Sequence, residues 1–414
     1  MIDISKIKYR LVIMDENGKQ YNIKDFVDTL GWEEPKNQLA TRITFTCRNT
    51  ESAEIVMDQV AKIGCLVGVF ASLDGGNDGL DDEVARGYIT MVKPKSSLDQ
   101  EMLTIRCYDD LYNLQQSEDN MFFSEGMDTE DIISHVFTTW GIPMETYDGP
   151  HERHAKKAYK TEKLSDIVLD TLDDAAKKGA AKCIVRANKG RISVLPRGSN
   201  QKVYCFDVTN ATAMDYSIST EGMVTRVKII GKEDDDGKTS VEAVLDGKTE
   251  FGVRQEIKTR SEDDSLEDAK TEAQQLLDEE GIPQKDISLK SPDIPWVRKG
   301  DLIYINGGYL KGYYYIAGIS HDAENGTMDM DIEEATPETV SEEKTKDYQV
   351  GDIVNFHGGT HYVSSYDGSA GYHAGAGPAK ITIIAAEGRA HRYHLIHTDS
   401  SSNVYGWVDA GTFD

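Results

Sequence analysis

Short apolar runs that alternate with polar residues, with turn-forming residues between them, dominate the first hundred positions. β-branched and aromatic residues at every second position favour strands, and clusters of Gly, Asn and Asp favour the turns that connect them. Only residues 51–63 favour a helix in this part. The pattern predicts a β-barrel or β-sandwich over residues 1–108, with strands at residues 7–14, 41–47, 65–71, 85–92 and 102–108.

From residue 109 onward the spacing of apolar residues changes to three and four, which predicts helices. Residues 128–140 carry apolar side chains at this spacing, and residues 165–178 repeat the pattern. A hairpin over residues 183–195 follows, with the sequence NKG at its turn. Two helices and a hairpin predict a small α+β domain over residues 109–200.

Strand patterns return over residues 201–335, where we predict a second β-barrel with one inserted helix. That helix begins after Ser265, which can form a capping box with Asp268. Residues 336–346 (TPETVSEEKTK) are polar and charged, which predicts a linker. Residues 347–414 are rich in Gly, Ser, Tyr and His and predict a small β-barrel. The predicted fold class is therefore mainly β with an α+β insert.

The composition excludes several classes of protein. Acidic residues outnumber basic residues by 72 to 45, which gives a formal charge of −27. Because nucleic-acid affinity depends on Lys and Arg at the phosphates, we expect no specific nucleic-acid binding. The apolar runs are too short for a membrane span or for the core of a signal peptide. We therefore expect synthesis in a reducing cytoplasm without a signal peptide.

The standard catalytic and metal-binding motifs do not match this sequence. The 5 cysteines are widely spaced and lack a C-x-x-C pair, so most of them are interpreted as core residues. Residues 151–154 (HERH) are one residue short of the H-E-x-x-H zinc motif and are interpreted as a solvated loop. His391, His394 and His397 alternate between faces of a strand and are interpreted as surface residues. We expect no catalytic residue, no metal and no cofactor.

The aromatic side chains of residues 347–414 leave two interpretations open. They can fill the core of the small barrel, or they can line a groove that binds a sugar or a peptide. In the second case the predicted ligand-binding residues are Tyr362, Tyr366, Tyr393, Tyr405 and Trp407.

Six parts of the sequence carry a resemblance. They are residues 105–114 (IRCYDDLYNL), 129–142 (TEDII to WGI), 221–229 (EGMVTRVKI), 300–303 (GDLI), 315–321 (YIAGISH) and 328–332 (MDMDI). In this order they resemble the XkdQ/YqbQ-type hub proteins, akin to late-control-D hubs, of contractile phage tails and phage-tail-like bacteriocins. The resemblance covers about residues 1–335, and the closing GWV sequence makes residues 347–414 similar to a bacterial SH3-like domain.

The resemblance implies a structural role in a virion or bacteriocin particle. Residues 1–108 and 201–335 would be tube-type barrels, and three copies would form a ring that joins the sixfold tail tube to the threefold central spike. The partners would be the tail tube protein, the spike and other baseplate subunits, with a possible cell-wall contact through residues 347–414. The alternative is a cell-wall-targeted peptidoglycan hydrolase or a wall-binding module.

Overall fold

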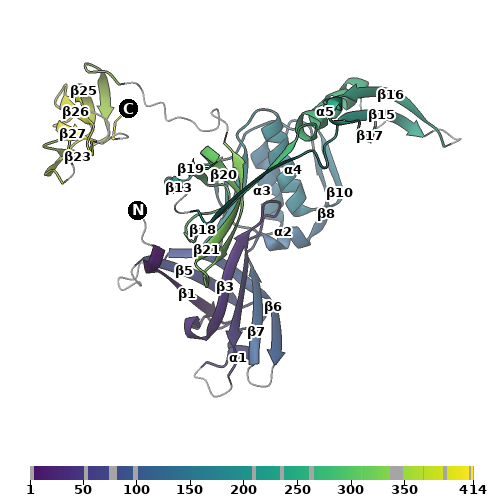
Figure 1. Cartoon of the computed structure of the whole chain (residues 1–414), viewed down its shortest axis with the longest axis horizontal. Coiled ribbons are helices and arrows are strands. Elements are labelled where there is room, and N and C mark those ends of the chain that lie inside the picture. Colours follow the sequence, from purple (N-terminus) through teal and green to yellow (C-terminus); the bar gives the residue numbers. More distant parts are fainter. Residues whose placement is uncertain are drawn as a thin grey trace. The chain divides into compact units, whose positions relative to one another are not determined.

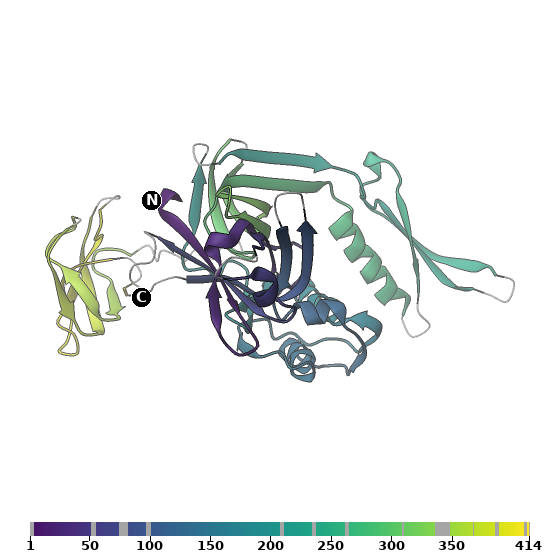
Figure 2. The ribbon, with the colours of Figure 1, turned by 90° about the horizontal axis from the view of Figure 1, so that it is seen from below.

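The computed structural model divides into two compact units, Met1–Thr336 and Pro337–Asp414, which we call unit 1 and unit 2. Figures 1 and 2 show their ribbons. The predicted linker over residues 336–346 lies outside the described residues. Those are residues 4–50, 55–73, 82–96, 101–207, 211–233, 237–260, 265–308, 310–335, 348–366, 368–385, 389–409 and 412–413.

Unit 1 is built around a sheet of 13 strands, in the order β14-β18-β21-β20-β3-β4-β7-β6-β5-β1-β2, with β19 paired to β20 and β13 paired to β19. The early strands are β1 (Ile7–Met14), β2 (Gln20–Asn22), β3 (Val27–Glu34), β4 (Arg42–Arg48), β5 (Leu66–Leu73), β6 (Asp82–Ser96) and β7 (Glu101–Tyr108). The late strands are β13 (Tyr204–Asp207), β14 (Ala213–Ser219), β18 (Gln284–Pro292), β19 (Leu302–Gly307), β20 (Leu310–Asp322) and β21 (Thr327–Glu334). The predicted mainly β class is confirmed. Among the described strands, no pairing joins β2 to β3 or β13 to β14, so hydrogen bonds close neither predicted barrel.

One antiparallel strand pair joins the early and late strands into this single sheet. β3 pairs with β20 from Gly31, opposite Asp322, to Glu34, opposite Ile319. Because cross-strand partners point to the same face, one polar row crosses the junction without a break. The row consists of Lys290, Asp329, Ser320, Glu33 and Arg42.

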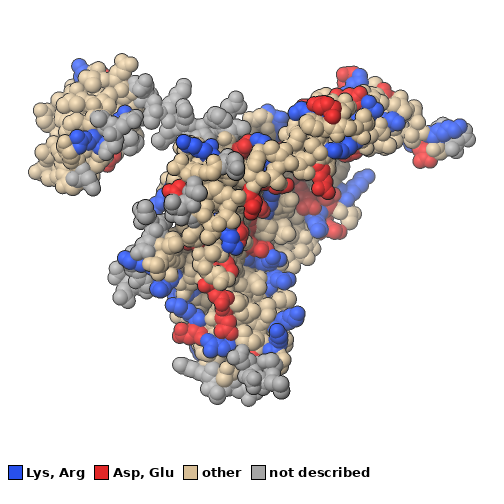
Figure 3. Space-filling model, in the orientation of Figure 1, with Lys and Arg blue, Asp and Glu red and all other residues tan. Residues whose placement is uncertain are grey.

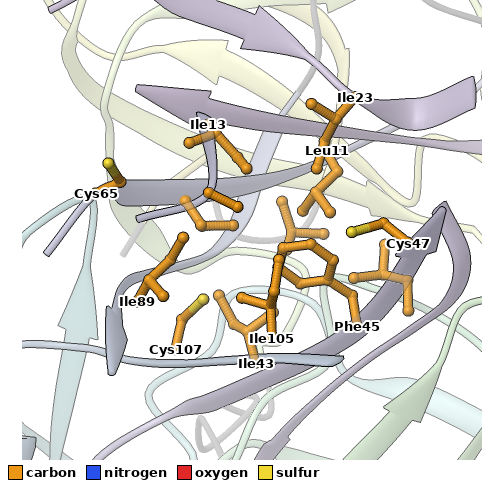
Figure 4. Close-up of a cluster of buried hydrophobic side chains, with 14 of the residues drawn as sticks. Leu11, Ile13, Ile23, Ile43, Phe45, Cys47, Cys65, Ile89, Ile105 and Cys107 are labelled. Carbon is orange, nitrogen blue, oxygen red and sulfur yellow. The ribbon is translucent and has the colours of Figure 1, made fainter. Parts of the chain in front are cut away.

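The apolar face of the early strands encloses the core drawn in Figure 4. Burial alternates along β4, so that Phe45 and Cys47 point inward, in agreement with a period of two residues. Cys47, Cys65 and Cys107 are buried free cysteines in this core, as the sequence predicted. Burial, together with the charge of Asp28, raises the pKa of Cys47 to about 12, so this residue remains a thiol.

The middle part of unit 1 contains the two long helices that the sequence predicted between residues 109 and 200. Its helices are α2 (Tyr112–Gln116), α3 (Thr129–Thr139) and α4 (Leu164–Lys177). Its strands are β8 (Glu118–Phe123), β9 (Met144–Tyr147), β10 (Lys157–Lys163), β11 (Cys183–Asn188) and β12 (Arg191–Pro196). The predicted hairpin is β11–β12, with φ of 50° at Lys189 and 76° at Gly190, as a tight two-residue turn requires. In the first part of the chain, by contrast, the described residues 55–63 of the helix predicted over residues 51–63 are helical only in α1 (Met57–Val60).

The part of the chain that connects β14 to β18 forms a separate small sheet, where the sequence predicted strands of the second barrel. It consists of β15 (Arg226–Glu233), β16 (Thr239–Asp246) and β17 (Gln255–Thr259), in the order β16-β15-β17. The predicted helix is α5 (Leu266–Glu280), and Ser265 and Asp268 form its capping box. Its residues Ala269, Ala273 and Leu277 pack on one face of the small sheet. Figures 1 and 2 both show this sheet extending away from the 13-stranded sheet.

Unit 2 is a sheet of six strands in the order β22-β25-β26-β27-β23-β24. These are β22 (Ile353–Phe356), β23 (Gly359–Tyr362), β24 (Gly371–Ala374), β25 (Gly377–Ile384), β26 (Tyr393–His397) and β27 (Tyr405–Val408). It has a core of its own, which includes Phe356, Leu395 and Val408. In the described part of both units, no helix is long and apolar enough to cross a membrane.

Candidate functional site: the 293–301 connection

The connection between β18 and β19, residues 293–301 (DIPWVRKGD), contacts side chains from all three parts of unit 1. Two backbone turns fold it: the N–H of Val297 donates to the carbonyl of Ile294 (3.0 Å), and the N–H of Asp301 donates to that of Arg298 (3.1 Å). Asp293, Val297 and Asp301 are buried. Buried polar groups need hydrogen-bond partners, and here distant segments of the chain supply them.

The carboxylate of Glu34, at the end of β3, is the partner of two residues of the connection. Nε of Arg298 donates to its Oε1 at 2.7 Å, and the backbone N–H of Lys299 donates to its Oε2 at 3.2 Å. The side chains of Glu34 and Arg298 are only 7% and 16% exposed. Burial alone would raise the pKa of Glu34, but the charges of Arg298, Arg186 and Lys299 lower it below its ordinary value. Glu34 is therefore a buried carboxylate that depends on its cationic partners.

A second buried ion pair joins the connection to the β11–β12 hairpin. Nη2 of Arg186, on β11, donates to Oδ1 of Asp301 at 2.7 Å, and these side chains are 16% and 6% exposed. Nη1 of Arg298 also reaches this hairpin and donates to the carbonyl of Ala187 at 2.8 Å. Arg298 thus bonds both β3 and the hairpin, and this links the early strands to the middle part.

Gly300 allows the hairpin and the connection to approach each other closely. Its φ is +87°, and a Cβ at this position would lie 2.2 Å from Cδ1 of Ile184. Its N–H donates to the carbonyl of Ile316 at 2.7 Å, and its carbonyl accepts from the N–H of Gly198 at 2.8 Å. Both the backbone conformation and the space around it therefore require glycine.

The first residues of the connection contact β1 and β6. The hydroxyl of Tyr9 donates to Oδ2 of Asp293, and Nε1 of Trp296 donates to Oδ2 of Asp82 at 3.0 Å. Oδ1 of Asp293 faces the ring of His321 at 2.6 Å. The connection therefore contacts both early strands (β1 and β6) and a late strand (β20), in addition to the β11–β12 hairpin.

Asp109 is a buried carboxyl group close to the same joint. It accepts hydrogen bonds from the backbone N–H groups of Thr41 (2.9 Å) and Leu111 (3.1 Å). Burial raises its pKa to about 7, although these hydrogen bonds and the charge of Arg298 act in the opposite direction. The folded chain thus holds this proton to a much higher pH than the unfolded chain, in which an aspartate has a pKa of about 3.9.

This difference predicts how the stability depends on pH. The contribution of Asp109 to stability is present below about pH 4 and is lost as the pH rises through about 7, where the buried group becomes charged. From pH 5 to pH 8, the excess stability of the wild type over Asp109→Asn is expected to fall by about 1–3 kcal/mol. Urea unfolding at the two pH values measures this change. Ser320→Ala, which changes no titratable group on the same sheet, is the control, and its difference from the wild type is expected to be the same at the two pH values.

The aromatic residues predicted as a ligand site occupy different environments in unit 2. Tyr393 is 7% exposed and belongs to the core, whereas Tyr366 and Tyr405 are 58% and 65% exposed. Tyr362 and Trp407 are cross-strand partners on β23 and β27. The ring of Trp407 is partly buried and meets His394 edge to face at 5.3 Å. Only Tyr393 is thus enclosed by the fold.

Two of the three histidines predicted at the surface, His391 and His394, have contacts that a fully exposed position does not provide. His391 is 8% exposed, stacks on Tyr362 at 3.5 Å and bonds Asp409 at 2.6 Å. His394 is partly buried and contacts the hydroxyl of Thr382 at 2.6 Å. The surface interpretation is therefore wrong for His391, whereas His394 is only partly buried. It is correct for His397, which is exposed and whose Nδ1 lies 2.9 Å from the backbone carbonyl oxygen of Asp399.

His154 was interpreted as part of a solvated loop, and this interpretation is wrong because its side chain is fully buried. Its Nδ1 lies 2.6 Å from Oδ2 of Asp174, and its Nε2 lies 2.8 Å from the hydroxyl oxygen of Thr129. Burial lowers the pKa of His154, which favours the neutral imidazole. The order Thr–His–Asp is that of a hydrolase triad, but Thr129 is 0% exposed in the first turn of α3. Substrate cannot reach it, so the cluster fastens α3 to α4.

Metal binding is not indicated in the part of the chain that the structure describes. No group of three or more His, Cys, Asp or Glu side chains in those ranges could hold a metal ion.

The fold and the motifs agree with one family. A family model described as YQBQ-like matches residues 16–333, so the chain belongs to the YQBQ-like family. The uncharacterized protein YqbQ of Bacillus subtilis (strain 168) is 22% identical over 258 residues, which are 61% of this chain and 77% of that protein. The predicted resemblance to the XkdQ/YqbQ type is confirmed.

Two solved structures share the fold at low sequence identity. The prophage MuSo2 43 kDa tail protein from Shewanella oneidensis has a TM-score of 0.57 and 15% identity, with 80% of this chain and 100% of that chain covered. The tail protein from Neisseria meningitidis MC58 has a TM-score of 0.55 and 13% identity, with 79% and 96% covered.

Proposed function

We propose that the chain is the structural hub of a contractile phage-type tail baseplate, in which three copies form a ring between the sixfold tail tube and the threefold central spike. The observation that carries this proposal is the single sheet that unites two β-rich parts of one chain through β3 and β20. Three copies of such a chain bring six β-rich parts around one axis, which suits a sixfold tube. Two proteins of the same fold are named as tail proteins, which supports this role.

A hub of this kind needs its two β-rich parts held rigidly. The 293–301 connection meets this need, because buried ion pairs to Glu34 and Arg186 hold the late strands against the early strands and the hairpin. Buried charge pairs constrain geometry strongly, since a displaced partner leaves a charge uncompensated. The function is therefore mechanical, and we expect no catalytic turnover.

We assign the polar face of the 13-stranded sheet to the central channel of the ring. Its carboxylates include the exposed Asp286, Asp329 and Asp331, and Glu33 continues the row across the junction. The basic side chains of the row, Lys290 and Arg42, are paired with Asp329 and Glu33. Because these cations already have carboxylate partners, the row attracts a phosphate backbone only weakly, so DNA could pass without binding. On the face of unit 1 shown in Figure 3, basic side chains are interspersed with acidic ones and form no continuous stripe. The partners at either end of this channel would be the tail tube protein and the spike.

Unit 2 would be an SH3-like module that contacts the cell wall or a neighbouring baseplate subunit. The accessible aromatic residues Tyr366, Tyr405 and Trp407 suit this contact, whereas Tyr393 serves the core. Trp407→Ala is expected to leave the unfolding of unit 2 nearly unchanged and to abolish retention on purified cell wall or on the particle. Tyr393→Ala, the matched variant, is expected to destabilise unit 2 by about 3–5 kcal/mol. Equal destabilisation by both variants would place Trp407 in the core instead.

The proposed function is tested by assembly in cells that lack the gene. The full chain, and a chain that ends at Ala335, are both expected to restore complete tails, because unit 1 contains the whole sheet. Purified protein incubated with peptidoglycan is expected to release no soluble fragments. If cells that lack the gene still formed complete tails, the proposed role as a structural hub would be contradicted. A reproducible hydrolytic turnover that one point substitution abolishes would favour the peptidoglycan hydrolase.

A further inference from the structure

A groove in unit 1 lies where the middle part meets the late strands, next to the 293–301 connection. Its volume is about 510 Å³, and residues of α4, β11, β20 and the β3–β4 connection line it. Much of the lining is apolar and includes Leu39, Leu169, Leu172, Ile184 and Ile316. Sites that enclose a bound group have volumes of about 300–1,000 Å³, so this groove is large enough to take side chains from another molecule.

The groove also carries positive charge that the chain leaves unpaired. Each acidic residue of its lining already has a cationic partner, in the pairs Asp170–Lys157, Asp173–Lys177 and Glu333–Arg197 at 2.7, 3.0 and 2.9 Å. Among the residues that the structure describes, no carboxylate forms an ion pair with the other two cations of this lining, Lys182 and Lys299. Lys299 donates two of its three N–H groups, to the carbonyls of Pro35 (2.9 Å) and Gln38 (2.6 Å). The groove therefore suits an apolar group that has a carboxylate beside it.

The turn between β16 and β17 has this chemistry. It contains the short helix η3 (Thr249–Phe251), and Phe251 is 44% exposed. Val253 is 57% exposed, and the carboxylate of Glu250 is exposed beside them. Exposed apolar side chains that lie close together mark surfaces that bind other molecules.

Hydrogen bonds fix the shape of this turn, although its apolar side chains lie in water. The hydroxyl of Thr225 donates to the carbonyl of Gly252 at 2.7 Å and accepts from the N–H of Arg254 at 2.8 Å. A surface that is already ordered loses less entropy on binding than a flexible one. The turn is therefore preformed for docking against another surface.

We propose that Phe251 and Val253 of one copy dock into this groove on a neighbouring copy, where Glu250 pairs with Lys182. Because these apolar side chains are exposed in their own chain, the contact joins two copies. Two different surfaces on each copy make a heterologous contact, which closes into a ring when the rotation between copies permits it. This inference rests on the proposed ring of three chains and names a contact that holds it together.

Exchange of the two charges tests the pairing in cells that assemble tails. Glu250→Lys alone and Lys182→Glu alone are each expected to lower the yield of complete tails at least about threefold, because like charges then meet. Both substitutions in one chain are expected to restore the yield, since the pair is reversed. The control joins Glu250→Lys with Lys311→Glu, an exposed lysine outside the groove, and is expected to restore nothing. A double exchange no better than either single variant would overturn the pairing.

Cross-linking tests the contact itself in assembled tails. Cys183→Ser and Cys205→Ser remove the cysteines that are not buried, and Leu169→Cys and Val253→Cys then place one thiol in the groove and one in the turn. A short bismaleimide is expected to give covalent trimers, and a mixture of chains with one of these two thiols each is expected to give dimers. Ile63→Cys, at a residue that is 64% exposed, replaces Val253→Cys as the control and is expected to give no link.

The outcome separates this contact from the hub itself. Three copies of the chain at the hub without a link between positions 169 and 253 would overturn the groove contact and leave the proposed function standing. Any other number of copies would overturn the proposed function.

Discussion

Arg298→Ala is expected to lower the free energy of unfolding of unit 1 by roughly 3–5 kcal/mol, because it leaves the carboxylate of Glu34 buried without its main partner. Arg298 also donates to the carbonyl of Ala187, so the loss extends to the contact with the β11–β12 hairpin. Urea unfolding of the full chain, followed by circular dichroism, measures the change.

The control for this prediction is an exposed ion pair on the same sheet. Lys290 and Asp329 are 3.3 Å apart and are 44% and 56% exposed, so Lys290→Ala is expected to cost at most about 1 kcal/mol. Glu34→Gln combined with Arg298→Met removes both charges together, and it is expected to be much less destabilising than Arg298→Ala alone. If Arg298→Ala cost no more than Lys290→Ala, the joint would not depend on its buried charges.

Gly300→Ala is expected to destabilise unit 1 by about 2–5 kcal/mol, for two reasons that add. A residue other than glycine at a φ of +87° costs about 1–2 kcal/mol. The added Cβ would also lie 2.2 Å from Cδ1 of Ile184, and overpacking of this kind costs about 1–3 kcal/mol. The same unfolding measurement applies.

Two variants separate these contributions. Gly252 has a φ of +96° with nothing within 4 Å of its Cβ position, so Gly252→Ala is expected to show the backbone cost alone. Ile184→Val removes the Cδ1 atom, so in that background Gly300→Ala is expected to cost about 1 kcal/mol less than in the wild type. If Gly252→Ala and Gly300→Ala lowered the free energy of unfolding by the same amount, the hairpin would accommodate the added Cβ at position 300 without a measurable cost.

The long helices α3, α4 and α5 were predictable from the sequence because their signals are local. In α3 and α5 the apolar residues recur at helical spacing, and Asp128 and Ser265 mark the first turns. The turn of the β11–β12 hairpin at Lys189 and Gly190 was predictable for the same reason. These features depend on residues only a few positions apart, and tertiary contacts reinforce them.

The joint was not predictable, because its partners are far apart in the sequence. Glu34 and Arg298 are separated by 264 positions, and no local pattern indicates that they meet. The sequences GDLI and YIAGISH contributed to the family resemblance and contain Gly300, Asp301 and His321. Their role at the joint became visible only through the pairing of β3 with β20.

Burial in unit 2 shows a similar limit. Tyr393 and Tyr405 look equivalent in the sequence, yet one is 7% exposed and the other 65%. Each of them lies on a strand where a shift of one residue reverses the face that a side chain occupies. The number of aromatic residues therefore did not show which of them lie in the core and which are accessible. The register of β26 and β27 shows this.

The proposed ring of three chains is tested most directly by image reconstruction of the intact tail at a resolution that separates chains. The expected result is three copies of unit 1 around the axis, with six β-rich parts next to the tail tube and the polar face of the 13-stranded sheet toward the channel. Two or six copies at the hub would contradict the proposal, and so would a ring whose channel is lined by other subunits.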